Sequence, residues 1–175
     1  NLEGPLTHAD HAPVAKKYRY RSPPEKVAPA LLNAGFNVVS LANNHAMDQG
    51  VEGLQHTLDA LDLVGIKHTG AGMNLAEARK PAILESHGAR VAFLAYTLTF
   101  PEEFWATPDR PGSPFGHEAQ VRADIVAAKS QADIVLVSFH WGQEGKTELR
   151  DYQKSLGRAA IDAGAAAVIG HHPHV

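Results

Sequence analysis

The stretch DIVLVSFH at residues 133–140 is an apolar run that ends at a histidine, and it indicates which fold the chain adopts. A second run, FNVVSLA at residues 36–42, leads into Asn-Asn-His at residues 43–45. A third, at residues 165–169, leads into Gly-His-His-Pro-His at residues 170–174. If these runs are parallel strands of one sheet, their polar tips meet at its carboxyl edge, where open α/β sheets place ligands. The sequence therefore predicts an α/β fold with one site at that edge.

Composition indicates a single globular domain over residues 1–175. The chain is 44% hydrophobic, and a domain of this size buries roughly 70% of its unfolded surface. It has no cysteine, so any metal must be held by histidine, asparagine or carboxylates. The formal net charge is -3 with acids and bases interspersed, which predicts no binding of nucleic acid. One basic segment, residues 16–21, is either a solvated loop or a contact for an anionic substrate.

Hydrophobic spacing predicts alternating helices and strands. The predicted helices cover residues 24–34, 51–64, 75–79, 117–129 and 151–163. The predicted strands cover residues 36–42, 67–70, 81–86, 90–96, 133–139 and 165–169. Ser22 and Glu25 have the spacing of a capping box for the first helix, and His87-Gly88 suits a hairpin turn. Residues 97–116 hold four prolines and several aromatic residues, which predicts a lid or binding loop.

Each strand tip also has a purely structural interpretation. Residues 43–45 suit a helix-capping turn, and His140 beside Trp141 suits a half-buried histidine packed on an aromatic ring. His172 and His174 are more informative, because alternate residues of an extended segment point the same way. An amide oxygen, several imidazoles and an acid near the start of the chain form a ligand set suited to Zn, Mn or Fe. Their conjunction favours a metal site.

Several motifs together resemble those of the CapA/PgsA-type poly-γ-glutamate capsule-synthesis proteins. They are NLEGPLT at residues 1–7, LANNHAMD at 41–48, AGMNLAEA at 71–78, HWGQE at 140–144 and GHHPHV at 170–175. These proteins belong to the calcineurin-like metallophosphoesterase superfamily. The resemblance implies a four-layer α/β/β/α metallophosphoesterase-like sandwich with a centre of two divalent transition metals, Zn, Mn or Fe, at the strand tips.

The resemblance also implies roles for individual residues. The implied metal ligands are Glu3, Asn44, His140, His172 and His174. Glu3 stands where the superfamily has its metal-bridging carboxylate, and Asn44 and His140 stand at the second metal. His45 is implied to act on the leaving group, with Asp48 orienting its ring.

The chain departs from the superfamily pattern at both ends. The superfamily begins with a strand ending in Gly-Asp, whereas this chain opens at Asn1, so we expect the first strand to be missing and the domain to be a fragment of a longer protein. The first metal would then lack a ligand, and the sheet would have an exposed edge that favours dimerisation. At the other end, His171 and His172 compete for one role. The His-x-His spacing favours His172.

These implications favour a metal-dependent, phosphoesterase-like hydrolase that acts in poly-γ-glutamate capsule synthesis. The expected substrate is an anionic small molecule or polyglutamate, and the expected partners are capsule-synthesis membrane proteins and a second copy of the chain. The expected location is the cell surface or another extracytoplasmic site, with an anchoring segment outside residues 1–175. The alternative is a non-catalytic cell-surface assembly factor for polyglutamate export.

Overall fold

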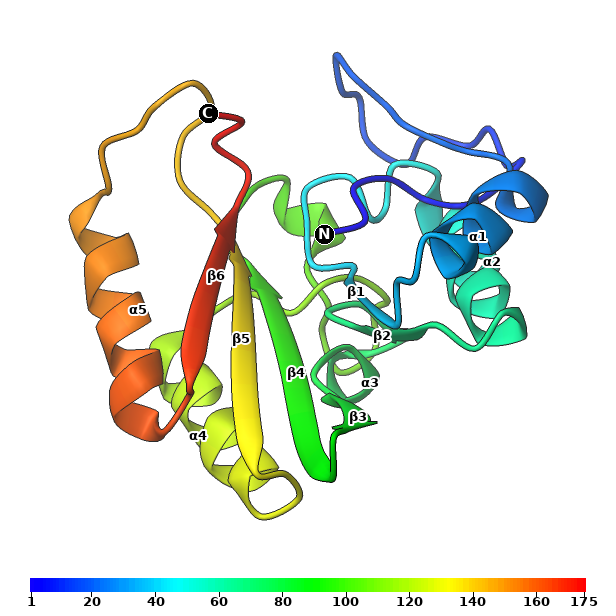
Figure 1. Cartoon of the computed structure of the whole chain (residues 1–175). Helices are drawn as coiled ribbons and strands as arrows, with labels where there is room; N and C mark the ends of the chain where they lie inside the picture. The colour runs from blue at the N-terminus through cyan, green and yellow to red at the C-terminus, as the bar shows by residue number, and fades with distance from the viewer.

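The computed structural model describes all of residues 1–175, and the chain forms four layers (Figure 1). The helices are α1 (Pro24–Asn33), α2 (Gly50–Leu63), α3 (Leu75–Ala78), η1 (Glu102–Phe104), α4 (Glu118–Lys129) and α5 (Asp151–Ala163). The strands are β1 (Val38–Ser40), β2 (Lys67–Thr69), β3 (Ala82–Ser86), β4 (Ala89–Thr97), β5 (Ile134–His140) and β6 (Ala167–His171). Helices α4 and α5 cover one sheet, and α1 and α2 cover the other. The predicted α/β/β/α sandwich is confirmed.

The larger sheet has the order β3-β4-β5-β6. Strands β4, β5 and β6 are parallel, whereas β3 pairs antiparallel with β4. The connecting turn uses His87 and Gly88, whose φ angles are 50° and 81°. Two consecutive positive φ angles are what a type I′ hairpin turn requires. The predicted hairpin is therefore confirmed.

Side-chain alternation along β5 sends its two faces to different neighbours. Val135, Val137 and Phe139 are buried in the apolar core formed with α4 and α5. Burial of each such side chain stabilises the fold by roughly 1.5–3 kcal/mol. Ser138 and His140 alternate with these residues and are also buried, at 1% exposure each. The apolar core thus determines the strand register that turns His140 toward the second sheet.

The smaller sheet contains only β1 and β2, which are parallel. The prediction that residues 36–42 form a strand in the same sheet as β5 and β6 is wrong on both length and sheet. Because β2 has three residues, the ladder with β1 runs only from Val38 to Ser40. The N-terminal segment lies along β1, where the Leu2 N–H donates to the Ser40 carbonyl at 2.9 Å.

The two sheets approach each other closely at three small residues. A Cβ atom at Gly70, where φ is +86°, would lie 2.7 Å from the Ala42 Cβ and 2.8 Å from the Ala95 Cβ. Any side chain at position 70 would therefore force something to move. This contact brings the residues that follow β1 and β2 against β4 of the larger sheet.

Two further local predictions are wrong. The first helix has no capping box, because Pro23 occupies its N-cap without a side-chain hydrogen bond and Glu25 pairs with His8 at 2.9 Å. The last strand begins two residues later than predicted and includes His171. The preceding residues complete the turn after α5, where Gly164 adopts a φ of 112° and the Ala165 N–H bonds back to Ala160.

The proline-rich segment 97–116 is a loop, as predicted, and it is well packed. Its Phe104 is only 2% exposed, and the Trp105 indole N–H donates to the Thr99 carbonyl at 2.8 Å. The rings of Trp105 and Phe115 lie 4.1 Å apart. A role for this loop as a lid stays a prediction.

Candidate metal centre

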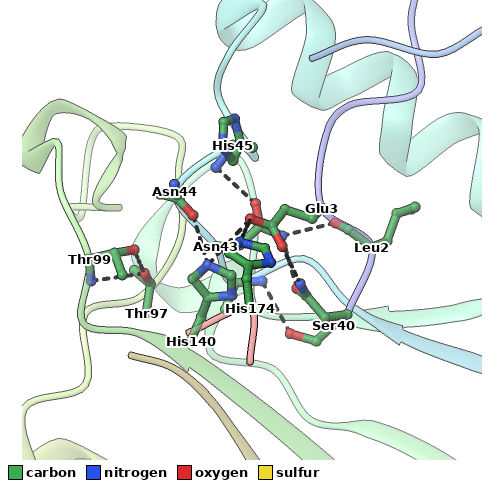
Figure 2. A network of polar contacts seen from close by, with 12 residues as sticks. Leu2, Glu3, Ser40, Asn43, Asn44, His45, Thr97, Thr99, His140 and His174 are labelled. Atoms are coloured by element: carbon green, nitrogen blue, oxygen red, sulfur yellow. Dashed lines mark hydrogen bonds and ion pairs between the residues drawn. The ribbon is translucent and has the colours of Figure 1, made fainter. Parts of the chain in front are cut away.

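The predicted site residues gather where the carboxyl ends of β1, β5 and β6 meet (Figure 2). His140 is the last residue of β5, and the histidines at 172 and 174 follow β6. Asn44 lies in the loop after β1. Glu3 reaches the same place from the N-terminal segment, which the Leu2 bond to β1 holds in position. The structure therefore brings all five predicted ligands to one edge of the sandwich.

Asn43 and Asn44 have different surroundings despite being adjacent. Asn43 is buried, its Oδ1 accepts from the His45 N–H at 3.0 Å, and its Nδ2 donates to the Leu2 carbonyl at 2.9 Å. Asn43 thus forms a local turn and joins the loop to the N-terminal segment. The helix-capping interpretation is wrong, because the N-cap of α2 is Gln49, which has no side-chain capping bond. Asn44 instead has its Oδ1 2.7 Å from His140 Nε2. Only Asn44 is directed at the histidines.

The first ligand group consists of Glu3, His140 and His172. One possible ligand atom from each lies within 4.8 Å of the others, and Glu3 Oε1 is 3.7 Å from His140 Nε2. Zinc binds nitrogen and oxygen ligands at about 2.0–2.2 Å, so small side-chain shifts allow these atoms to share one ion. With the Asn44 amide oxygen, the group offers the mixed donor set that Zn, Mn or Fe accepts.

The electrostatics of this group favour neutral imidazoles. Burial, followed by repulsion from the nearby imidazoles of His172, His171 and His174, lowers the pKa of His140 to about 2. Burial also lowers the pKa of His172. Only a neutral imidazole can ligate a metal. The Nδ1 atoms of His140 and His172 are buried without a hydrogen-bond partner, which is uncommon for buried polar atoms. The donor chemistry therefore fits a divalent cation, with Nε2 as the His140 nitrogen that faces Glu3 and Asn44.

A second ligand group contains a residue that the sequence analysis did not assign. Glu144, His172 and His174 also offer ligand atoms within 4.8 Å of one another. Glu144 was visible in the motif HWGQE, four residues after His140, but that spacing alone does not show where its carboxylate lies. His172 belongs to both groups, and His171 belongs to neither.

The backbone at the C-terminal histidines is not extended. His172 and His174 have φ angles of 97° and 54°, so the prediction that an extended segment aims both side chains the same way is wrong. Their rings instead lie 6.0 Å apart at an interplanar angle of 60°. Positive φ angles at bulky residues store strain, and such strain concentrates at functional sites. These two residues are thus held in an unfavourable geometry that places their rings beside Glu144 and Glu3.

His45 lies at the periphery of the cluster around Glu3 and His140 (Figure 2). Its Nδ1 is 2.5 Å from Asp48 Oδ2, and the Tyr20 ring stacks on it at 4.1 Å. Burial raises the pKa of Asp48, but hydrogen bonds from His45 and Lys16 outweigh that effect, so the pKa lies below its ordinary value. The predicted contact between His45 and Asp48 is therefore present.

Lys16 belongs to the basic segment, yet it is not a solvated side chain. Its Nζ donates to Asp48 Oδ1 at 2.6 Å and to the Asn44 carbonyl at 2.5 Å, and it lies 3.1 Å from His45 Nδ1. The solvated-loop interpretation is wrong for this residue, although Tyr18 of the same segment is 59% exposed. Contacts across some 30 residues of sequence leave no local pattern that sequence reasoning could have used.

A cavity of about 630 Å³ adjoins the cluster. Asn44, Glu144 and His172 line its polar side. Phe100 and Phe115 come from the proline-rich loop, and Arg150 and Tyr152 come from the start of α5; all four line the same cavity. The predicted loop therefore reaches the candidate site.

No helix of the chain has the length and apolar character to cross a membrane.

Comparison with known proteins gives one family. The family model described as bacterial capsule synthesis protein PGA_cap matches residues 1–175. The PGA biosynthesis protein CapA of Bacillus subtilis (strain 168) is 37% identical over 100% of this chain and 46% of its own length. The capsule biosynthesis protein CapA of Bacillus anthracis is 35% identical over 100% and 44%. The probable polyglutamine synthesis accessory protein of Mycobacterium tuberculosis is 36% identical over 99% and 48%. The chain thus spans just under half the length of these relatives.

Proposed function

This chain belongs to the bacterial capsule synthesis protein family PGA_cap, and we propose that it serves poly-γ-glutamate capsule synthesis through a dinuclear-metal, phosphoesterase-like hydrolase site. The observation that carries the proposal is the convergence of Glu3, His140 and His172 ligand atoms within 4.8 Å. Relatives named for PGA biosynthesis and polyglutamine synthesis support the capsule role. Because a capsule lies outside the cell, we place the protein at the cell surface.

Some residues of the site would bind cations, and others would transfer a proton. Glu3, Asn44, His140 and the C-terminal histidines would hold divalent ions of the Zn, Mn or Fe type. The chemistry that two such ions supply when bound is Lewis acidity at phosphorus and a lowered pKa of water. The neutral state of His140, which its lowered pKa ensures, keeps its nitrogen available for this purpose.

His45 is the residue that we assign to proton transfer. Asp48 accepts at the His45 Nδ1, which leaves Nε2 as the ring atom that can present a proton. The protonated ring would give this proton to the oxygen that leaves phosphorus, and the neutral ring would keep its bond to Asp48. The stacked Tyr20 ring holds the imidazole in one orientation.

The cavity beside the cluster suits an anionic substrate with apolar parts. Arg150 contributes a guanidinium, which binds phosphate and carboxylate groups well. Phe100, Phe115 and Tyr152 provide the apolar walls. An anionic small molecule or a polyglutamate segment has this combination of charge and hydrocarbon.

Metal content and hydrolysis of an aryl phosphate test the proposal together. The wild-type protein, loaded with Zn or Mn, should hydrolyse the ester, and a chelator should abolish the activity. His8→Ala is a matched control, because His8 is an exposed histidine whose only polar partner is Glu25. Bound metal without any hydrolysis would refute the catalytic part of the proposal.

A second candidate function is a non-catalytic assembly factor for polyglutamate export. The word accessory in the name of the Mycobacterium tuberculosis relative favours it. Capsule formation in cells separates the two functions, since an assembly factor would still support it after His45→Ala. A hydrolase would not.

Partners form the last part of the proposal. We propose capsule-synthesis membrane proteins as partners, and a second copy of the chain as a further one. Strands β3 and β6 are the edges of the larger sheet and are the places where a second copy could add strands. Light scattering on the purified protein measures the mass, and a monomer at all concentrations would argue against the homodimer.

A further inference from the structure

The loop that follows β5 carries an acidic residue that the mechanism above does not use. We propose that Glu144 is a metal ligand and that, with His174, it forms a second cation position within this chain. This inference rests on the proposed function and deepens it, because it adds a ligand that the family resemblance did not imply.

The distances place Glu144 in the second ligand group, which shares His172 with the first. Ligand atoms of Glu144, His172 and His174 lie within 4.8 Å of one another. Glu3 Oε1 lies 3.8 Å from His174 Nε2 and 3.7 Å from His140 Nε2. A carboxylate between two histidines of different groups can serve both cations. Glu144, His172 and His174 supply three protein ligands, the number that a catalytic zinc site usually has.

The position of Glu144 follows from the backbone around it. Gly142 turns the chain sharply after β5 with a φ of 96°, and a Cβ there would lie 3.3 Å from the Pro173 ring. The Gly145 N–H then donates to the Pro173 carbonyl at 2.7 Å. Pro173 lies between the two histidines in sequence. This hydrogen bond therefore holds the Glu144 loop directly against the His172–His174 segment.

The uncommitted charge of Glu144 and an unpartnered nitrogen of His172 support the same assignment. None of the salt bridges of the chain uses Glu144, so its carboxylate is not committed to a lysine or arginine. In the same ligand group, the Nδ1 atom of His172 is buried and has no hydrogen-bond partner. A carboxylate opposite two imidazoles, with one nitrogen unpartnered, matches the oxygen and nitrogen donors that zinc and manganese accept.

The test compares Glu144→Gln with Glu148→Gln in the whole chain. Both changes remove one negative charge from the same loop and keep the side-chain size, and Glu148 belongs to neither ligand group. Zinc and manganese binding would be measured by calorimetry and by elemental analysis after dialysis. We expect two ions in the wild type and in Glu148→Gln. In Glu144→Gln the second ion should bind more than about 100-fold more weakly, beyond the 10–100-fold typical of residues that only support a ligand.

Each outcome separates this inference from the proposed function. If Glu144→Gln binds the same number of ions as the wild type with unchanged affinity, Glu144 is not a ligand and the inference is wrong. If Glu148→Gln loses the ion equally, general charge explains the effect, and the inference is again wrong. If the wild type binds no metal, or His140→Ala retains all of it, the proposed function itself fails. Circular dichroism of each variant confirms that the fold is intact.

Discussion

His140 and His45 are both buried, at 1% and 7% exposure, yet their surroundings are opposite. His140 has an unpartnered Nδ1, other imidazoles nearby and a pKa lowered to about 2. The His45 Nδ1 has Asp48 at 2.5 Å and Lys16 at 3.1 Å, and its ring is stacked on Tyr20. The surroundings of His140 leave room for a bound cation. The partners of His45 already hold its ring in one orientation, which suits proton transfer.

The greatest loss of metal and activity should follow from replacing His140. We expect His140→Ala to lose the metal ion held by the first ligand group and to reduce phosphoester hydrolysis to background, because a direct ligand is gone. Elemental analysis and the aryl phosphate assay measure the two effects. Full metal content in this variant would show that the buried nitrogen is structural.

Replacing His45 should lower turnover and leave the metal in place. For an alkyl phosphate, whose leaving oxygen needs a proton, we expect His45→Ala to lower kcat by about 10²–10⁴-fold. An aryl phosphate, which has a better leaving group, should show a smaller loss. Metal released from His45→Ala would make His45 a ligand and remove the contrast between the two residues.

Substitutions in the two environments should also differ in their effect on the free energy of unfolding. Asp48 has no exposed side-chain surface and forms buried contacts with Lys16 and His45. Removal of one partner from a buried ion pair costs about 3–5 kcal/mol, since the other charge is left uncompensated. We therefore expect Asp48→Asn to lower the free energy of unfolding by about 3 kcal/mol in urea titrations. Metal-free His140→Ala should lose less, because the imidazole of His140 is neutral and its removal breaks no ion pair.

A fall in pH should gradually remove the contribution of Asp48 to the free energy of unfolding. The pKa of this carboxyl is lower in the folded than in the unfolded chain, so its stabilisation is fully present above the unfolded pKa of about 3.9. It is lost as pH falls through the folded pKa, at no more than about 1.4 kcal/mol per pH unit. Unfolding of the wild type and Asp48→Asn should therefore converge in acid. A stability difference that stays constant to low pH would contradict the ion pair.

Local spacing predicted the elements of the larger sheet well. Val121, Ile125 and Ala128 share one helical face of α4, and all three are buried in the core. Gly164 ends α5 with a left-handed φ, as a glycine after the last apolar position suggests. These signals depend only on neighbours within a few residues, which is why sequence reasoning could use them.

The sheet that contains β1, and two side chains of the site, depend on distant contacts. Strand β1 pairs with β2, and no spacing within residues 36–42 encodes that partner. Lys16 reaches Asp48 across 32 residues, and the Gly145–Pro173 hydrogen bond joins the loop of Glu144 to the segment of His174. Such placements follow from tertiary packing and are invisible in a single sequence.

The close contact at Gly70 has a consequence for which metal the site would accept. Asn44 follows β1 of one sheet, whereas His140 ends β5 and His172 follows β6 of the other. The separation of the sheets therefore determines the distances between these ligands. Zinc requires ligands at about 2.0–2.1 Å and calcium at about 2.3–2.6 Å. A larger residue at position 70 would strain its own backbone and lengthen the distances between the ligands. Ion selectivity would then change through a residue that touches no ligand.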